Sequence, residues 1–220
     1  MAQRSIQVGM NPTVVIKTGT GVSVEGWDKG QVRAETPTRG GLRVEARRQS
    51  EISRARAAVG DHLLFDVRLK LPGSKKSDAG DTIEVHIGGE GKVRVPRDSR
   101  VKVYAGKEVQ VSDIQGPVVL FTGGDVLVRG VRSLAHISSG GAVDLECDTI
   151  EGNEAKFEAG LDLRCSIRSL SSARVIVSDL DGDWEGLIGS GEMTLRLKAG
   201  GNVTLVTDQR NFTGIPRNSP

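Results

Sequence analysis

Residues 100–130 read RVKVYAGKEVQVSDIQGPVVLFTGGDVLVRG, and this stretch decides the fold. Two aliphatic residues separated by one residue alternate with short turns, many of which contain glycine, and the pattern continues to residue 207. A fixed period of this kind is typical of a solenoid, in which each coil buries its inner face on the next coil. The pattern predicts the architecture and says much less about function.

The aliphatic residues recur in ladders. Two ladders have spacings of 17, 17, 20, 20 and 20: Val101, Val118, Ala135, Ala155, Val175, Leu195, and Val103, Leu120, Ile137, Phe157, Val177, Leu197. Two more have spacings of 17, 17 and 18: Val109, Val126, Val143, Leu161, and Val111, Val128, Leu145, Leu163. A third corner holds Ile114, Val131, Ile150 and Ile167. The two pairs of ladders and this corner make three inward sets per coil. They predict a roughly three-sided coil, with a flattened two-sided coil as the alternative.

We therefore expect an all-β protein, a right-handed parallel β-solenoid (β-helix) with an N-terminal strand-rich section and an inserted hairpin. The expected segments are an N-terminal β section with a degenerate first coil (1–99), a hairpin insertion within it (37–80), the solenoid coils (100–207), and a tail or C-terminal cap (208–220). Leu42–Ala46 and His62–Leu71 alternate like hairpin strands. The Arg-rich stretch 47–59 between them is compatible with a short helix or a loop.

Composition limits the classes of protein. The chain of 220 residues is 37% hydrophobic and 3% aromatic with a formal net charge of +2, so no nucleic-acid partner is expected. No run approaches the roughly 18 apolar residues of a membrane span. Met1–Met10 lacks the apolar region of a signal peptide. These features predict no membrane insertion and a cytoplasmic location, with association with the cell envelope as the alternative.

Two segments resemble a known family. Val14–Trp27 (VVIKTGTGVSVEGW) and Val93–Gly116 (VRVPRDSRVKVYAGKEVQVSDIQG) are similar to motifs of the bacterial "putative adhesin" β-solenoid family of unknown function. Members show a TGxGxVxVxGW-like opening, a VPxDxxVxVxxG step and repeated GxVxVxGVxG coils. The resemblance covers residues 13–36 and 82–207. It implies a β-solenoid and brings no catalytic residue with it.

The densest acidic cluster lies in the turn 179–185, with carboxylates at Asp179, Asp181, Asp183 and Glu185. Its start resembles an EF-hand loop, but Trp184 stands where that loop needs glycine and Ser190 where it needs glutamate. The three aspartates are weak candidates for a Ca²⁺ site, and the turn is a candidate for the paired carboxylates of a glycan-cleaving enzyme. We favour an acidic turn between coils, with Leu180 and Trp184 packed inside.

Other reactive residues point to no catalytic site, metal or cofactor. The only cysteines, Cys147 and Cys165, are expected to stack as buried thiols in adjacent coils, with a disulfide as the alternative. His136 follows an inward position and is expected to point to solvent. The Gly-Gly pairs at 123–124, 140–141 and 200–201 are expected to supply positive φ angles at turns. The Arg-rich residues between 39 and 56 are interpreted as a solvated surface rather than a nucleic-acid or lipid contact.

The favoured function is a non-enzymatic structural or protein-interaction scaffold that self-associates. The end of a solenoid exposes unpaired backbone groups, which pair with another chain unless they are covered. Residues 1–95 are expected to cover the N-terminal end. The interaction surface is therefore expected at the C-terminal end, with Leu195, Leu197, Val203, Leu205, Phe212 and Ile215. The alternative is a glycan-binding or glycan-cleaving β-helix protein that uses the acidic turn 179–185.

Overall fold

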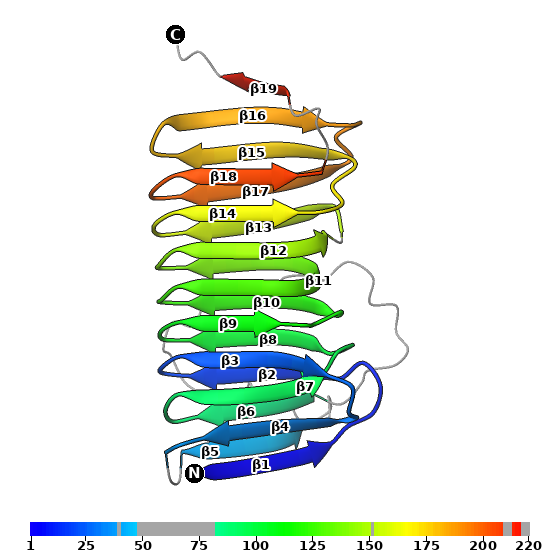
Figure 1. Cartoon of the computed structure of the whole chain (residues 1–220), viewed down its shortest axis with the longest axis vertical. Coiled ribbons are helices and arrows are strands. Elements are labelled where there is room, and N and C mark those ends of the chain that lie inside the picture. The colour runs from blue at the N-terminus through cyan, green and yellow to red at the C-terminus, as the bar shows by residue number, and fades with distance from the viewer. Residues whose placement is uncertain (39–40, 48–81, 151, 209–212, 217–220) are drawn as a thin grey trace, which may run out of the picture.

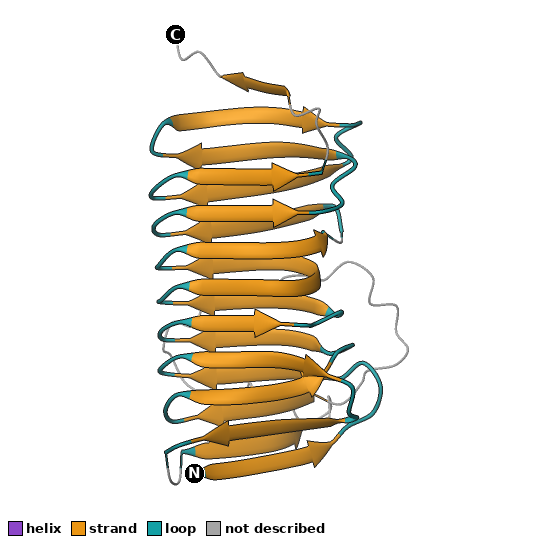
Figure 2. Cartoon of the chain, in the orientation of Figure 1, coloured by secondary structure: helices purple, strands orange, loops and turns teal. Residues whose placement is uncertain are grey.

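The chain folds entirely from β-strands in the part that the computed structural model describes, residues 1–38, 41–47, 82–150, 152–208 and 213–216. The expected all-β class is confirmed. No helix in the described residues is long and apolar enough to cross a membrane. The nineteen strands found there belong to one mixed sheet. They are stacked along the long axis of the molecule (Figures 1 and 2).

One face of the stack, called ladder A here, is a continuous series of paired strands. Its order is β5 (Leu42–Arg47), β6 (Thr82–Ile87), β2 (Thr13–Thr18), β8 (Arg100–Ala105), β10 (Pro117–Thr122), the C-terminal half of β11 (Val126–Ser139), β13 (Glu154–Ala159), β17 (Met193–Ala199), β15 (Ala173–Asp179), β16 (Gly182–Ile188) and β19 (Thr213–Pro216). The pairs from β6 to β15 are parallel. Antiparallel pairs close both ends.

The other face is ladder B. Its order is β1 (Ala2–Gln7), β4 (Gln31–Thr36), β7 (Gly91–Pro96), β3 (Val22–Trp27), β9 (Val109–Ser112), the N-terminal half of β11, β12 (Val143–Thr149), β14 (Leu163–Ile167) and β18 (Val203–Thr207). Strand β11 belongs to both ladders and joins them. Side chains alternate along the strands, and the buried ones of both ladders form one hydrophobic cluster. The core therefore lies between the two ladders.

Two ladders replace the three sides expected from the sequence. Val131 and Ile167, assigned to a third corner, continue ladder B through their pairing with Cys147. Ile114 and Ile150 are buried in the turns beside that ladder. The flattened two-sided arrangement is the one that the strand pairing supports.

The order of strands in the stack differs from their order in the chain. Strand β2 lies between β6 and β8, and β17 lies between β13 and β15 (Figure 1). As a result Ala155 is opposite Leu195, and Leu195 is opposite Val175. The expected order Ala155, Val175, Leu195 is therefore wrong, although all three side chains are buried. One strand position separates β13 from the β15–β16 hairpin. Strand β17, which follows the hairpin in the sequence, occupies this position.

Two ladder assignments are corrected by register. Val118 is opposite Leu134, because a register shift in β11 moves Ala135 off the ladder. Val143 is opposite Leu163 rather than Leu161, which is 58% exposed. The chain carries extra residues between β12 and β13, so the period lengthens from 17 to 20 in both ladders.

The turns at one corner of the stack carry a column of glycines: Gly19, Gly106, Gly123, Gly140, Gly160 and Gly200. A Cβ on Gly140 would lie 2.8 Å from the carbonyl oxygen of Gly123, and a Cβ on Gly200 would lie 2.3 Å from that of Gly160. Positive φ angles occur at other glycines, such as Gly130 and Gly182. The expectation that the Gly-Gly pairs supply positive φ is wrong, because these glycines permit close approach instead.

The N-terminal hairpin and the tail are only partly described. Leu42–Arg47 forms β5, whereas His62–Leu71 and residues 48–59 lie outside the described residues. Residues 213–216 of the tail form β19, which pairs with β16. The N-terminal end of the stack is formed by β1, β4 and β5 (Figure 1). The proposed segment boundaries stay a prediction.

Candidate functional site

The acidic turn connects β15 to β16, and three of its four carboxylates are engaged locally. Asp179 accepts a hydrogen bond from the backbone N–H of Asp181 at 3.0 Å. Asp183 accepts one from the Ser178 hydroxyl, and Glu185 is paired with Arg174. No group of three or more His, Cys, Asp or Glu side chains within the described ranges is placed to hold a metal ion.

The packing expected inside this turn is half right. Trp184 packs against the core. Leu180 is 71% exposed, because it stands at the tip of the β15–β16 hairpin rather than between two coils.

The expected C-terminal interaction residues do not share one surface. Leu195 and Leu197 are buried in β17, which is flanked by β13 and β15. Val203 and Leu205 are half-buried in β18, at the edge of ladder B. Ile215 lies in β19 opposite Glu185, and Phe212 lies outside the described residues. Strand β18 ends ladder B and β19 ends ladder A, and only β18 carries more than one of the expected residues within the described ranges, so the predicted role in assembly rests mainly on β18.

The two cysteines are free and buried. Cys147 is opposite Val131 and Ile167, whereas Cys165 is opposite Leu145 and Leu205, so the expected stacking of one thiol on the other is wrong. Burial raises the pKa of Cys147 to about 12, and it also raises the pKa of Cys165. Two buried thiols with raised pKa values do not form the electropositive, partly exposed surroundings that are typical of reactive cysteines.

An open groove of about 1220 Å³ lies on the outer face of ladder A. Outward side chains of neighbouring strands align there in two columns across β5, β6, β2, β8, β10 and β11. The first column is Arg43, His86, Lys17, Tyr104, Phe121 and Ser138. The second is Glu45, Glu84, Val15, Lys102, Val119 and His136. The groove follows the first column, and Lys102 lines its side.

Aromatic rings stack in the middle of the groove. The ring centroids of Tyr104 and Phe121 are 5.3 Å apart with planes 7° from parallel. The centroids of Phe121 and His136 are 5.0 Å apart with planes tilted by 42°. Both faces of the Phe121 ring are therefore covered by neighbours. Tyr104, the only tyrosine of the chain, is 42% exposed, and its neighbour on the other side is Lys17.

Among the described residues, the centre of the groove carries positive charge that no carboxylate pairs with. Strands β2, β8 and β10 and residues 134–139 of β11 contain no aspartate or glutamate. Neither Lys17 nor Lys102 has an ion-pair partner among residues that the structure describes. At the rim, Arg43 pairs with Glu45 at 2.5 Å and His86 contacts Glu84 at 3.3 Å. The groove therefore favours an anion at its centre.

His136 contributes a ring rather than a charge. Burial lowers the pKa of His136 below its ordinary value; Glu158 opposes this shift and Lys156 adds to it. The imidazole is therefore neutral at neutral pH, and it contacts Phe121 as a tilted ring. Its outward direction agrees with the sequence-based expectation, but it is half-buried by this contact.

The sequence contains a signal for the groove that lies outside the catalytic and metal-binding motifs. Tyr104 and Phe121 are 17 residues apart, and each directly follows an inward aliphatic residue. This spacing places two aromatic rings side by side on the outer face. The absence of acidic residues from the same strands is a second signal. Neither signal is part of a catalytic or metal-binding motif.

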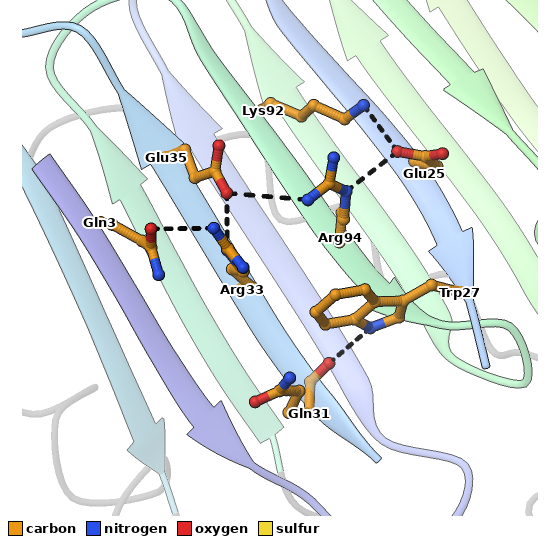
Figure 3. Close-up of polar contacts among 8 residues, drawn as sticks. All are labelled: Gln3, Glu25, Trp27, Gln31, Arg33, Glu35, Lys92 and Arg94. Atoms are coloured by element: carbon orange, nitrogen blue, oxygen red, sulfur yellow. Dashed lines mark hydrogen bonds and ion pairs between the residues drawn. The ribbon is translucent and has the colours of Figure 1, made fainter. Parts of the chain in front are cut away.

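A second polar cluster lies on the outer face of ladder B near the N-terminal end of the stack (Figure 3). Glu25 contacts Lys92 at 2.6 Å and Arg94 at 3.2 Å, and these two cations lower the pKa of its carboxyl. Glu35 contacts Arg33 at 2.6 Å and Arg94 at 3.8 Å. Each of the three cations therefore has a carboxylate partner in this cluster.

The same cluster fastens the antiparallel end of ladder B to its parallel part. Strand β4 pairs with β7 over only three residues, Arg33 to Glu35. Arg33 also donates a hydrogen bond to Gln3 of β1 at 2.9 Å, and Trp27 of β3 donates one to the carbonyl of Gln31 at 2.8 Å (Figure 3). Side-chain bonds across β1, β4, β7 and β3 supplement this short pairing. We therefore interpret the cluster as structural.

Comparison with known proteins identifies no family. No protein-family model matches the chain, and no curated protein sequence matches it. A solved structure of a "putative cell adhesion protein" from Clostridium sporogenes is 9% identical, covers 94% of this chain and 98% of its own, and superposes with a TM-score of 0.45. This likeness is too distant to carry an argument about function. The family resemblance of the sequence stays a prediction.

Proposed function

We propose that this chain is a non-enzymatic binding scaffold that holds a ligand on the outer face of ladder A. The observation that carries the proposal is the groove, with an exposed tyrosine and two lysines that have no ion-pair partner among the described residues, on strands that lack acidic residues. Convergent polar groups beside an apolar surface are typical of ligand sites. Turnover is not expected, because the central strands hold no carboxylate to act with a second group as acid and base.

We also propose that the parallel middle of the stack is a right-handed β-solenoid. From β8 to β14 the chain alternates between ladder A and ladder B, and strands of the same ladder are parallel. Crossovers between parallel strands of one sheet are right-handed in nearly all proteins. A rigid support of this kind would keep the groove residues of neighbouring strands at a fixed spacing.

The binding proposal is tested by comparing the wild-type chain with the charge-reversed variant Lys17→Glu/Lys102→Glu. Both proteins are assayed against five fluorescent probes: dextran, an oligogalacturonate, polyglutamate, an oligo(dT) and vesicles of phosphatidylglycerol with phosphatidylcholine. We expect the wild type to bind at least one probe that the variant does not bind. We also expect the wild type not to cleave that probe. If no probe distinguishes the two proteins, the proposal is wrong.

A further inference from the structure

We infer that the groove binds a linear acidic glycan, with a uronate carboxylate at Lys17 and Lys102 and a sugar ring against Tyr104. The inference rests on the proposed function, because it names the ligand class for the same site. Three features of the groove carry it: the position of the charges, a free aromatic face and free hydroxyl groups.

The charges fit a carboxylate on an extended chain. Lys17 of β2 and Lys102 of β8 project outward from neighbouring strands, two residues apart in register. Charge-assisted hydrogen bonds from lysine to carboxylate are about twice as strong as neutral ones. No acidic side chain on these two strands repels the ligand, and the rim carboxylates Glu45 and Glu84 already contact Arg43 and His86.

The free aromatic face fits a sugar ring. Phe121 covers one face of the Tyr104 ring, and on the other side the neighbouring strand presents the flexible side chain of Lys17. The negative face of an aromatic ring attracts the partly positive C–H groups of a flat apolar surface. A pyranose ring has such a face and carries its carboxylate at the edge. Tyr104 and Lys17 are therefore placed to contact the two parts of one uronic acid unit.

The hydroxyl groups fit the remaining edges of the sugar. Tyr104 and Ser138 are on the two strands that flank Phe121. In the described part of the chain neither hydroxyl has a hydrogen-bond partner. A hydroxyl both donates and accepts, as the hydroxyls of a sugar do. The two hydroxyl groups can therefore exchange hydrogen bonds with sugar hydroxyls on both sides of Phe121.

Other anionic ligands fit less well. A single-stranded nucleic acid needs several free ring faces for successive bases, whereas the faces of Phe121 are covered by Tyr104 and His136. An acidic peptide has carboxylates but no flat ring surface for Tyr104. A membrane surface is recognised by clusters of several basic residues, whereas the described part of the groove has two lysines without an ion-pair partner.

The test measures the affinity of the full chain for an oligogalacturonate by titration calorimetry. We expect Lys17→Gln/Lys102→Gln to weaken binding about tenfold or more, and Tyr104→Ala to weaken it about threefold to tenfold. The matched control is Lys29→Gln/Arg164→Gln, which removes two positive charges away from the groove and should bind like the wild type. Tyr104→Phe keeps the ring and loses only the hydroxyl, so it should weaken binding less than Tyr104→Ala does. Thermal unfolding confirms that each variant is folded.

Each outcome has a distinct meaning. Loss of affinity in the groove variants, with unchanged affinity in the control, supports the inference. Equal affinity in wild type and groove variants overturns it. Groove-dependent binding of polyglutamate, oligo(dT) or vesicles, without binding of the oligogalacturonate, also overturns it but leaves the binding scaffold intact. If no probe of any class depends on the groove, the inference and the proposed function are both wrong.

Discussion

Single atoms at the corner of the stack set how closely successive turns approach. Neighbouring strands lie about 4.8 Å apart, and at this spacing the Cα of Gly160 faces the backbone of Gly140 directly. A hydroxyl beside this contact completes the turn: Ser139 donates to the carbonyl of Gly124 at 2.6 Å and accepts from the N–H of Gly141 at 3.0 Å. Glycine at these positions is required by space, not by backbone conformation.

We predict that Gly160→Ala destabilises the protein and that Gly19→Ala does not. The new Cβ of residue 160 would lie 2.3 Å from the carbonyl oxygen of Gly140, whereas a Cβ on Gly19 would meet nothing within 4 Å. Overpacking against backbone costs about 1–3 kcal/mol, and each kcal/mol lowers Tm by about 2–4 °C in a chain of this size. Thermal unfolding of both variants checks this. Equal melting temperatures would show that the turns can move apart.

We predict that stability decreases below pH 6.5 in part because of His136. Burial holds the folded pKa of His136 below its ordinary value of 6.5. The unfolded chain therefore takes up the proton first as the pH falls. The stabilising contribution of the neutral ring is complete above pH 6.5 and is lost as the pH falls through the folded pKa.

The test of this pH dependence is denaturant unfolding of the wild type and His136→Phe between pH 7.5 and pH 5. The phenylalanine keeps a ring against Phe121 and does not titrate. We expect the wild type to lose more free energy of unfolding than the variant over this range. The same loss in both proteins would assign the pH dependence to groups other than His136.

At the scale of the strand, the alternation of inward and outward residues does not distinguish two positions that are two residues apart. A shift of two residues along the chain buries a different leucine and keeps the same alternation. Leu161 and Leu163 have the same spacing parity, so both fit an inward position in the sequence. In the structure Leu163 begins β14 and is 1% exposed, whereas Leu161 precedes the strand. The length of the turn before β13, rather than the alternation itself, decides between them.

We predict that Leu163→Ala costs about 2–5 kcal/mol of unfolding free energy, whereas Leu161→Ala changes it by about 0.5 kcal/mol or less. The reason is the difference in burial between the two side chains. Chemical denaturation of both variants measures it. A larger loss for Leu161→Ala would restore the register read from an 18-residue spacing.

Near each end of the molecule, strands are stacked in an order that differs from their order in the chain. Strands β2 and β3 lie between strands that come much later in the chain (Figure 1). Strand β17 follows the β15–β16 hairpin in the sequence, but in the stack it lies between β13 and that hairpin. Long-range pairing of this kind fixes both ends of the chain into the stack. Such topology is expected to fold slowly, because long loops close before the contacts that reward them form.

We predict that paired cysteines report this order. Glu158→Cys/Lys198→Cys places two outward thiols on adjacent strands, whereas Glu158→Cys/Ser178→Cys places them two strands apart. Adjacent strands at about 4.8 Å permit a disulfide, and a double separation does not. Mass spectrometry after mild oxidation should find a crosslink only in the first variant. The native thiols do not compete, because both are buried. A crosslink only between 158 and 178 would restore the sequential order.

We predict that any self-association uses β18. In the described part of the chain this strand pairs only with β14, and Val206 on it is 47% exposed. Charged side chains on an edge strand prevent pairing with another chain. Light scattering at high concentration should therefore show dimers for the wild type and monomers for Thr204→Lys/Val206→Lys. Leu127→Lys, on an interior strand, is the control. Identical masses for all three proteins would exclude this edge.

The sequence by itself determined the all-β class, the inward or outward direction of most strand residues and the glycine turns, because alternation and turn chemistry are local. It did not determine the order of the strands, since β15 and β17 carry similar patterns and either fits beside β13. One feature of the sequence does indicate the order: the turn glycine recurs at 160 and 200, whereas Leu180 stands at the position between them. Only the tertiary structure decided which strand lies beside which. It thereby aligned Lys17 from the start of the chain with Tyr104 and Phe121 and formed the groove.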